Sequence, residues 1–336
     1  MRQPDFSSSR LTVEIDLTHP GRRSGSFGLV WSDNTNPLGV WPIPAMVIVG
    51  SPGPTVLLIG GVHGDEYEGP AALARLYQAL APEEVTGRLI FLPALNLPAV
   101  RAGTRCSPLD GGNLNRMFPG LADGGPTAQI AHLVAACLMP ICDAVIDLHN
   151  GGTASWFLPC ALPARAADGG LDAANMALAR AFGTGVAWLL GAANDNRSVN
   201  GAATAAGVPC IAAELGGGGS IGIAPLALAE TGLRRVLVHL GVLPGALPET
   251  PPPRLVELTG PASRVVAPVE GLFLPERPAG RDIAAGERLG RIVAPERPDD
   301  PPVDIIARTT GLILAETRRA AVRPGAFLAL IATDVR

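Results

Sequence analysis

Three short apolar runs, each followed by glycine or a polar side chain, constrain the fold of this chain most strongly. They lie at residues 56–61, 144–149 and 208–215. A strand that is apolar almost throughout must be buried on both faces, as happens when helices cover both sides of a sheet. The sequence therefore predicts an α/β domain with a largely buried sheet.

Helical segments separate these strands. Proline suits the first turn of a helix, Pro140 ends one such segment, and Gly241 closes another. Strands that alternate with helices are typical of an α/β fold. The predicted helices span residues 70–80, 126–139 and 225–240, and further strands are predicted at 11–16 and 88–95.

The composition changes near residue 243. Residues 243–254 contain five prolines, which resist both helix and central strand and are typical of a linker. Beyond them, short apolar runs separated by glycine and proline turns predict an all-β module. The predicted organisation is a main domain at 1–245 with an N-terminal β segment at 1–50, a Pro-rich linker at 246–256 and a β-domain at 257–336.

Composition excludes several classes of protein. The net charge of −4 argues against a non-specific nucleic-acid binder. No window holds eighteen uninterrupted apolar residues, so no membrane-spanning helix is predicted. The polar stretch 1–10 predicts no signal peptide, and five cysteines without a C-x-x-C pair predict free thiols. Together these features predict a cytoplasmic protein.

All 26 basic residues are arginine. A Walker P-loop, a Schiff-base mechanism and a lysine general base each need an amine on a flexible stem. The composition therefore excludes these three chemistries.

Two of the five histidines follow predicted strands, where ligand sites of α/β sheets form. His63 comes after the first strand, three residues before Glu66 in a glycine-flanked turn, and His149 ends a distant strand. Two imidazoles and one carboxylate with an open fourth position make a catalytic zinc site. The H-x-x-E pair alone would also fit a surface loop, but the second strand-end histidine favours a metal site. Asp147 could orient an imidazole.

The other three histidines, His19, His132 and His239, are interpreted as structural. His132 lies among apolar residues of a helix, and His239 lies near a helix C-terminus, where a cation complements the helix dipole.

Glu214 is the best candidate for a general base. It lies in the otherwise apolar strand 208–215 and precedes four glycines. A carboxylate there is costly unless it has a role or a partner, and an ion pair with an arginine is the alternative. The segment 218–222 also fits the G-x-S-x-G nucleophile elbow, but it follows no strand directly and lacks a suitable acid and histidine after it.

A polar loop at 105–116 is the second concentration of functional side chains. Asn115 and Arg116 resemble a carboxylate clamp, since a guanidinium binds a carboxylate through two parallel hydrogen bonds. Arg105 could polarise a scissile carbonyl. For any single arginine, a solvated charge is the alternative.

Four motifs in this order, GGVHGDEYEGP, NLNRMFPG, DLHNGG and AELGGGG, resemble the succinylglutamate desuccinylase/aspartoacylase family, which is related to the zinc carboxypeptidases. The resemblance covers residues 50–245. The C-terminal part is similar to that family's small β-domain, a barrel-sandwich-like module, and carries no lysine for a covalent cofactor. The expected fold is thus a zinc carboxypeptidase-like mixed sheet flanked by helices, with a smaller C-terminal all-β domain.

The resemblance implies one Zn²⁺ per chain, with His63, Glu66 and His149 as metal ligands. It implies Glu214 as general base and later acid, Arg105 as the carbonyl-polarising arginine, and Asn115 with Arg116 as the clamp on the substrate carboxylate. Asn113 departs from the family's usual Asp, a change of little consequence if that residue only supports the loop. Aspartoacylases and carboxypeptidases also use a late tyrosine, which this chain lacks.

Within the family, GTRCSPLDGGNLNRMFPG and HGDEYEGP resemble most the deacetylases of Nα-acetyl-L-2,4-diaminobutyrate in ectoine degradation. The resemblance therefore implies a metal-dependent hydrolase of linear amides whose partner is a small N-acyl amino acid. A desuccinylase or another N-acyl amino acid deacylase is the alternative, and a non-catalytic binding protein on this fold is less favoured. Asp65, Glu68 and Asp110 are candidates for reading a substrate ammonium. A homo-oligomer is compatible with the sequence.

Overall fold

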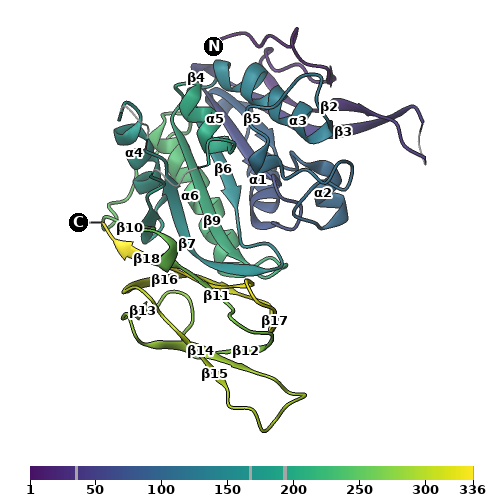
Figure 1. Ribbon diagram of the computed structural model, residues 1–336. Coiled ribbons are helices and arrows are strands. Elements are labelled where there is room, and N and C mark those ends of the chain that lie inside the picture. Colours follow the sequence, from purple (N-terminus) through teal and green to yellow (C-terminus); the bar gives the residue numbers. More distant parts are fainter. Residues whose placement is uncertain (35–36, 166–168, 192–194, 336) are drawn as a thin grey trace.

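The computed structural model describes residues 1–34, 37–165, 169–191 and 195–335 (Figure 1). The helices are α1 Glu68–Ala79, α2 Leu97–Ala102, α3 Pro126–His132, α4 Asp172–Phe182, α5 Val199–Ala205 and α6 Ile223–His239. The strands of the main domain are β1 Thr12–Val13, β2 Gly21–Trp31, β3 Gly39–Val49, β4 Ser51–Gly60, β5 Thr86–Leu92, β6 Ala144–His149, β7 Ser155–Pro163, β8 Val186–Trp188 and β9 Cys210–Gly217.

The C-terminal region consists of short strands. They are β10 Arg254–Glu257, β11 Arg264–Val266, β12 Gly271–Pro275, β13 Asp282–Ile283, β14 Arg288–Val293, β15 Val303–Ile306, β16 Gly311–Thr317, β17 Ala321–Val322 and β18 Phe327–Asp334. Single helical turns complete the chain: η1 Pro82–Glu84, η2 Leu114–Arg116, η3 Leu133–Leu138, η4 Met139–Ile141 and η5 Pro261–Ser263.

The centre of the main sheet is parallel. Strand β4 pairs in parallel with β5 on one side and β6 on the other, and β6 pairs in parallel with β9. The flanking strands β3 and β7 run antiparallel to this centre. The carboxyl ends of β4, β6 and β9 therefore meet at one edge of the sheet, where a site is expected.

Two cores cover the two faces of this sheet. In β4, Leu57 and Ile59 belong to the core shared with α5 and η3, while Val56 and Leu58 belong to the core shared with α1, α4 and α6. All four side chains are fully buried. The near-continuous apolar strand is thus explained by burial on both faces, and the predicted α/β class is confirmed.

The C-terminal region continues the main sheet rather than standing apart from it (Figure 1). Strand β10 pairs in parallel with β8 and antiparallel with β18, while β16 pairs with β7. Among the described residues, four other strands form a second sheet in the order β15-β14-β12-β17. The predicted linker at 246–256 was therefore too long, because Arg254 to Val256 already lie in β10.

Several predicted elements are present with changed ends. Strand β6 has the predicted bounds, whereas the alternating run at 11–16 keeps only the two residues of β1. The helix predicted at 126–139 is divided into α3, a π-helical turn η3 and η4. Pro140 has no N–H to donate, and the chain passes into η4 there. All five cysteines are free, as predicted, and Cys137 and Cys142 are buried.

Across the described parts of the chain, no helix has both the length and the apolar character needed to cross a membrane.

Candidate metal and substrate site

The edge of the parallel strands gathers four predicted site residues. The loop after β4 carries His63 and Glu66, and β6 ends at His149. Glu214 lies beside His149 because the two are partners in the register of β6 and β9. Gly64 permits the tight loop, since a Cβ there would lie 1.9 Å from the backbone carbon of Ala99.

His63, Glu66 and His149 converge on one point. The Glu66 carboxylate lies between the imidazoles, with Oε1 2.7 Å from Nδ1 of His63 and Oε2 2.8 Å from Nδ1 of His149. All three side chains are buried, and their ligand atoms lie within 4.8 Å of one another. Within the described residues, this is the one cluster of His, Cys, Asp and Glu with the geometry to hold a metal ion.

The far nitrogen of each imidazole is anchored. Nε2 of His149 lies 2.7 Å from Asp147 Oδ2, and Nε2 of His63 lies 3.1 Å from Asn113 Oδ1. The Asn113 oxygen also accepts from the Asn115 backbone N–H at 3.1 Å. Such anchors fix the ring orientation and the tautomer. The sequence interpretation of Asn113 as mere loop support was therefore incomplete.

The cluster is electrostatically coupled. Burial alone would raise the pKa of the Glu66 carboxyl, but the charges of His63 and His149 outweigh it and hold that pKa well below its usual range. Burial opposes the charged form of His149, yet Asp147 and Glu66 raise its pKa well above the usual value. A proton shared by this set must leave before a metal ion can bind.

Glu214 is the carboxylate with the opposite shift. Burial, together with the neighbouring Glu66 carboxylate, raises the pKa of Glu214 to about 8. Among the described residues, its Oε2 is buried without a hydrogen-bond partner. A carboxyl group with a pKa near neutrality can exchange protons readily at physiological pH.

Arg105 extends to the same cluster. Its Nη1 lies 3.3 Å from Glu66 Oε1 and 3.3 Å from His63 Nδ1. Half of the side chain is exposed. The guanidinium therefore lies at the boundary between the buried cluster and solvent.

Asn115 and Arg116 lie further out, in η2. The Asn115 oxygen accepts from the backbone N–H of Val199 at 3.1 Å, so part of that side chain holds the start of α5. Arg116 is partly exposed, and its Nε lies 3.0 Å from Asp195 Oδ2. The sequence interpretation did not include Asp195, since an isolated acidic residue in a loop gives no signal of its partners.

Two of the acidic candidates for an ammonium partner hold loops together. Asp65 accepts from the backbone N–H of Thr153 at 2.8 Å and from its hydroxyl at 3.1 Å. Glu68 accepts from the Asn150 amide and, at 3.0 Å, from the backbone N–H of Gly222. Both carboxylates thus fasten the loops that follow β6 and β9 to the start of α1.

Asp110, the third candidate, acts within its own loop. It accepts from the backbone N–H of Gly112 at 3.0 Å and from Thr127, whose N–H lies at 2.9 Å and whose hydroxyl lies at 2.6 Å. The observed bonds of these three acidic residues support the loops around the cluster.

The backbone of the four glycines that follow Leu215 is held in place by its conformation and by hydrogen bonds. Gly216 to Gly219 all have positive φ values, a conformation that other residues adopt only with strain. Gly218 donates to the Gly152 carbonyl at 2.7 Å and to the Ser155 carbonyl at 3.0 Å. The segment is therefore tied to the loop after β6.

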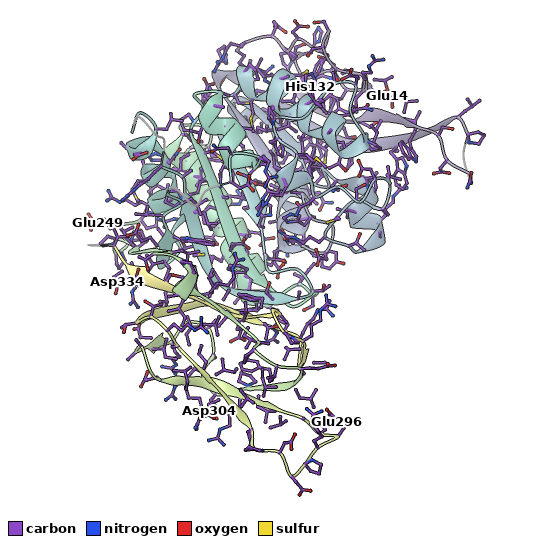
Figure 2. The ribbon with its side chains drawn as sticks, in the orientation of Figure 1. Glu14, His132, Glu249, Glu296, Asp304 and Asp334 are labelled. Carbon is purple, nitrogen blue, oxygen red and sulfur yellow. The ribbon has the colours of Figure 1, made fainter. Side chains whose placement is uncertain are left out.

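His132 and His19 lie apart from the cluster. His132 is at the end of α3 on the outside of the molecule, where its Nε2 lies 3.2 Å from the Ser8 carbonyl (Figure 2). His19 is exposed beside Asp16. Neither contact involves His63, Glu66 or His149.

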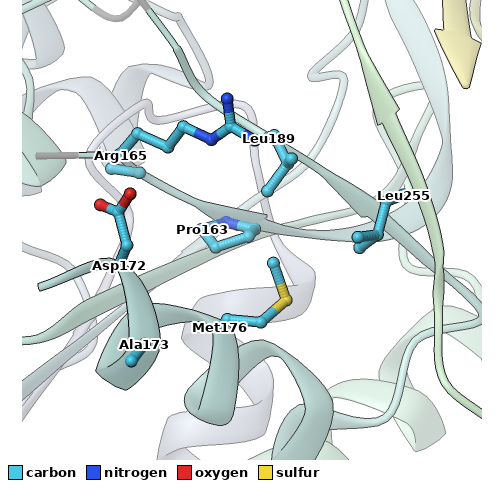
Figure 3. Close-up of a pocket in the computed structure, with 8 residues that line it drawn as sticks. Pro163, Arg165, Asp172, Ala173, Met176, Leu189 and Leu255 are labelled. Carbon is cyan, nitrogen blue, oxygen red and sulfur yellow. The ribbon is translucent and has the colours of Figure 1, made fainter. Parts of the chain in front are cut away.

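A separate cavity of about 290 Å³ lies between α4, the end of β7 and β10 (Figure 3). Its floor is apolar, and Arg165 and Asp172 stand at one side. No predicted site residue lines it. The lining residues are Pro163, Ala164, Arg165, Asp172, Ala173, Met176, Leu189 and Leu255.

An α/β sheet with a His₂Glu cluster and a neighbouring carboxyl group of raised pKa at its carboxyl edge is an arrangement suited to metal-assisted hydrolysis. Comparison with known proteins gives the particular family. Residues 52–240 match the succinylglutamate desuccinylase/aspartoacylase catalytic domain. The chain belongs to the succinylglutamate desuccinylase/aspartoacylase family, and it is accordingly a hydrolase that acts on the amide bonds of N-acyl amino acids.

Individual relatives resemble the chain over nearly its whole length. The N-alpha-acetyl-L-2,4-diaminobutyric acid deacetylase of Halomonas elongata is 34% identical over 97% of this chain and 96% of its own. The product-bound structure of the ectoine utilization protein EutE (DoeB) from Ruegeria pomeroyi is 36% identical, with a TM-score of 0.93 over 97% of this chain and 99% of that one. A succinylglutamate desuccinylase/aspartoacylase structure from Rhodobacter sphaeroides is 33% identical, with a TM-score of 0.92 over 98% and 100%.

Proposed function

We propose that this chain is a zinc-dependent deacetylase of Nα-acetyl-L-2,4-diaminobutyrate in ectoine degradation. The convergence of His63, Glu66 and His149 carries the proposal. The deacetylase activity of the Halomonas elongata relative supports the substrate, and the ectoine utilization protein of Ruegeria pomeroyi supports the pathway.

The donor set fits zinc. Two imidazole nitrogens and one carboxylate face a common point, and both far nitrogens are already anchored. Three protein ligands leave one position open, as in catalytic zinc sites. When bound there, zinc would supply a Lewis acid and lower the pKa of a water molecule toward neutrality.

The other side chains have distinct proposed roles. Glu214, with its raised pKa, takes a proton from water and delivers it to the departing amine. Arg105 donates hydrogen bonds to the carbonyl oxygen as negative charge develops on it. Asn115 and Arg116 bind the substrate carboxylate, which fixes the amide relative to Glu214.

The finer architecture belongs to the same proposal. The main domain is carboxypeptidase-like and spans 1–245, and the C-terminal domain is a barrel-sandwich-like module from 257 to 336. The five free cysteines support a cytoplasmic location, since thiols stay reduced in that compartment.

Acetate release from Nα-acetyl-L-2,4-diaminobutyrate tests the function directly. We expect release by the purified protein, loss of release after chelation, and recovery when zinc is added. A parallel panel of N-succinyl and other N-acyl amino acids tests the desuccinylase alternative. A protein that holds one zinc but prefers a succinyl substrate would contradict the proposed substrate and retain the proposed metal site.

A further inference from the structure

Asp195 lies between two guanidinium groups at the edge of the site. Arg197 binds it through both ends of its fork, with Nε 3.0 Å from Oδ1 and Nη2 2.9 Å from Oδ2. On the other side, Nε of Arg116 lies 3.0 Å from Oδ2. The side chain of Asp195 is partly buried, whereas both arginines are substantially exposed.

The segment that carries Asp195 is fastened to the predicted substrate loop. The Arg197 carbonyl accepts from the backbone N–H of Phe118 at 3.1 Å, and the N–H of Val199 donates to Asn115. The same loop contacts the predicted metal ligand His63 through the side-chain oxygen of Asn113. Arg197 is thus held beside Arg116, in a segment that is joined to the loop bordering the predicted metal ligands.

The carboxylate of Asp195 is occupied by the two arginines. Its Oδ1 accepts from Arg197 Nε and from the Arg197 backbone N–H, the latter at 2.9 Å. Its Oδ2 accepts from Arg197 Nη2, and Arg116 forms an ion pair with it, its Nε 3.0 Å away. A carboxylate offers about four such lone-pair positions. Hydrogen bonds from Arg197 lower the pKa of Asp195 to about 2, so the group stays charged at neutral pH.

The two guanidiniums of Arg116 and Arg197 and the carboxylate of Asp195 therefore carry a net charge of +1 between them. A single substrate carboxylate neutralises that charge. A second carboxylate on the substrate side chain would instead meet a guanidinium that Asp195 already neutralises, and it would lie close to the negative charge of Asp195. Placing like charges close together in a binding site is a means of rejecting wrong ligands.

We propose that Asp195 is a specificity-determining residue. It cancels one of the two guanidiniums, so that the site selects N-acyl amino acids with one carboxylate and a neutral or cationic side chain, and rejects those with an acidic side chain. This inference rests on the proposed function, because it assigns the clamp of that same site to the substrate carboxylate.

The test compares Nα-acetyl-L-2,4-diaminobutyrate with N-acetyl-L-glutamate. We expect Asp195→Asn to raise kcat/KM for N-acetylglutamate relative to the diaminobutyrate substrate by about tenfold or more. Asp195→Glu, which keeps the charge, should stay near the wild type. Adding Arg197→Gln to Asp195→Asn should remove the gain, because the released guanidinium is then absent.

Asp300→Asn is the matched control. Asp300 forms an exposed ion pair with Arg297 in the C-terminal region, with Arg297 Nε 2.8 Å from Asp300 Oδ2. This variant should leave the substrate ratio unchanged. An unchanged ratio in Asp195→Asn would overturn the inference while leaving the deacetylase function intact.

Binding of the same two ligands, measured by calorimetry, separates this inference from the proposed function. If the wild type hydrolyses neither ligand, the proposed function fails. The ratio of the two dissociation constants still tests Asp195, because the charge argument concerns binding. A ratio that Asp195→Asn does not move, or binding of neither ligand by either protein, would overturn the inference.

Discussion

The two sides of the site are held in different ways. On the strand side, His149 and Glu214 are placed by the register of β6 and β9, and Asp147 anchors the imidazole from the same strand. On the loop side, Arg116 depends on η2 and on its ion pair with Asp195. His149 and Asp147 on the strand side are buried and Glu214 is partly buried, whereas Arg116 on the loop side is substantially exposed.

This difference separates the residues proposed for the chemical step from the residues proposed to bind the substrate. Backbone pairing in the sheet fixes the strand side, so one side-chain change there alters function without moving its neighbours. The loop side relies on side-chain bonds between segments about eighty residues apart, and exposed charges are screened by salt. We therefore expect substitutions on the strand side to act on turnover and metal affinity, and those on the loop side to act on substrate affinity.

Glu214→Gln tests the strand side with the largest expected effect. The amide cannot accept the proton of water, so turnover should fall by about 10²–10⁴-fold. Zinc content should stay at one per chain, since Glu214 is not among the three clustered ligands. Steady-state kinetics and metal analysis on the same preparation check both statements. Wild-type turnover in this variant would remove Glu214 from the mechanism.

The anchors of the two imidazoles should differ in strength. A carboxylate makes an imidazole a better ligand than a neutral amide does, so Asp147→Asn should weaken zinc binding by about 10–100-fold. The reciprocal change, Asn113→Asp, should strengthen it. Competition with a chromogenic chelator measures both affinities. Equal affinities in wild type and Asp147→Asn would show that the anchor is unimportant for the metal.

Arg116→Ala tests the loop side. Loss of a charge-assisted pair with the substrate carboxylate should raise KM by about tenfold or more, with a smaller change in kcat. The increase should shrink at high ionic strength, since the side chain is 43% exposed. Arg277→Ala, in the C-terminal region, is the control. A large fall in kcat at unchanged KM would place Arg116 in the chemical step instead.

The same contrast explains what the sequence could predict. Strand β6 and helix α6 follow from local patterns, and His149 follows from the rule that sites form at strand ends. Strand β7 escaped prediction because it contains Pro159 and Pro163, which read as strand breakers. The contact between Arg116 and Asp195 could not be predicted, because only the tertiary fold brings these residues together.

The pH dependence of stability gives the smallest expected effect. Burial raises the pKa of Glu214 from an ordinary 4.5 to about 8, so the folded protein holds this proton more tightly than the unfolded chain. The stability gained from that proton is complete below about pH 4.5 and is lost as the pH rises toward 8.

In metal-free protein, Glu214→Gln should therefore raise Tm at pH 8.5 relative to the wild type by more than it does at pH 5. Glu249→Gln, at an exposed position (Figure 2), should follow the wild type at both pH values. A difference in Tm between Glu214→Gln and wild type that does not change with pH would mean that the buried carboxyl titrates normally, and the contrast between the two sides of the site would then rest on geometry alone.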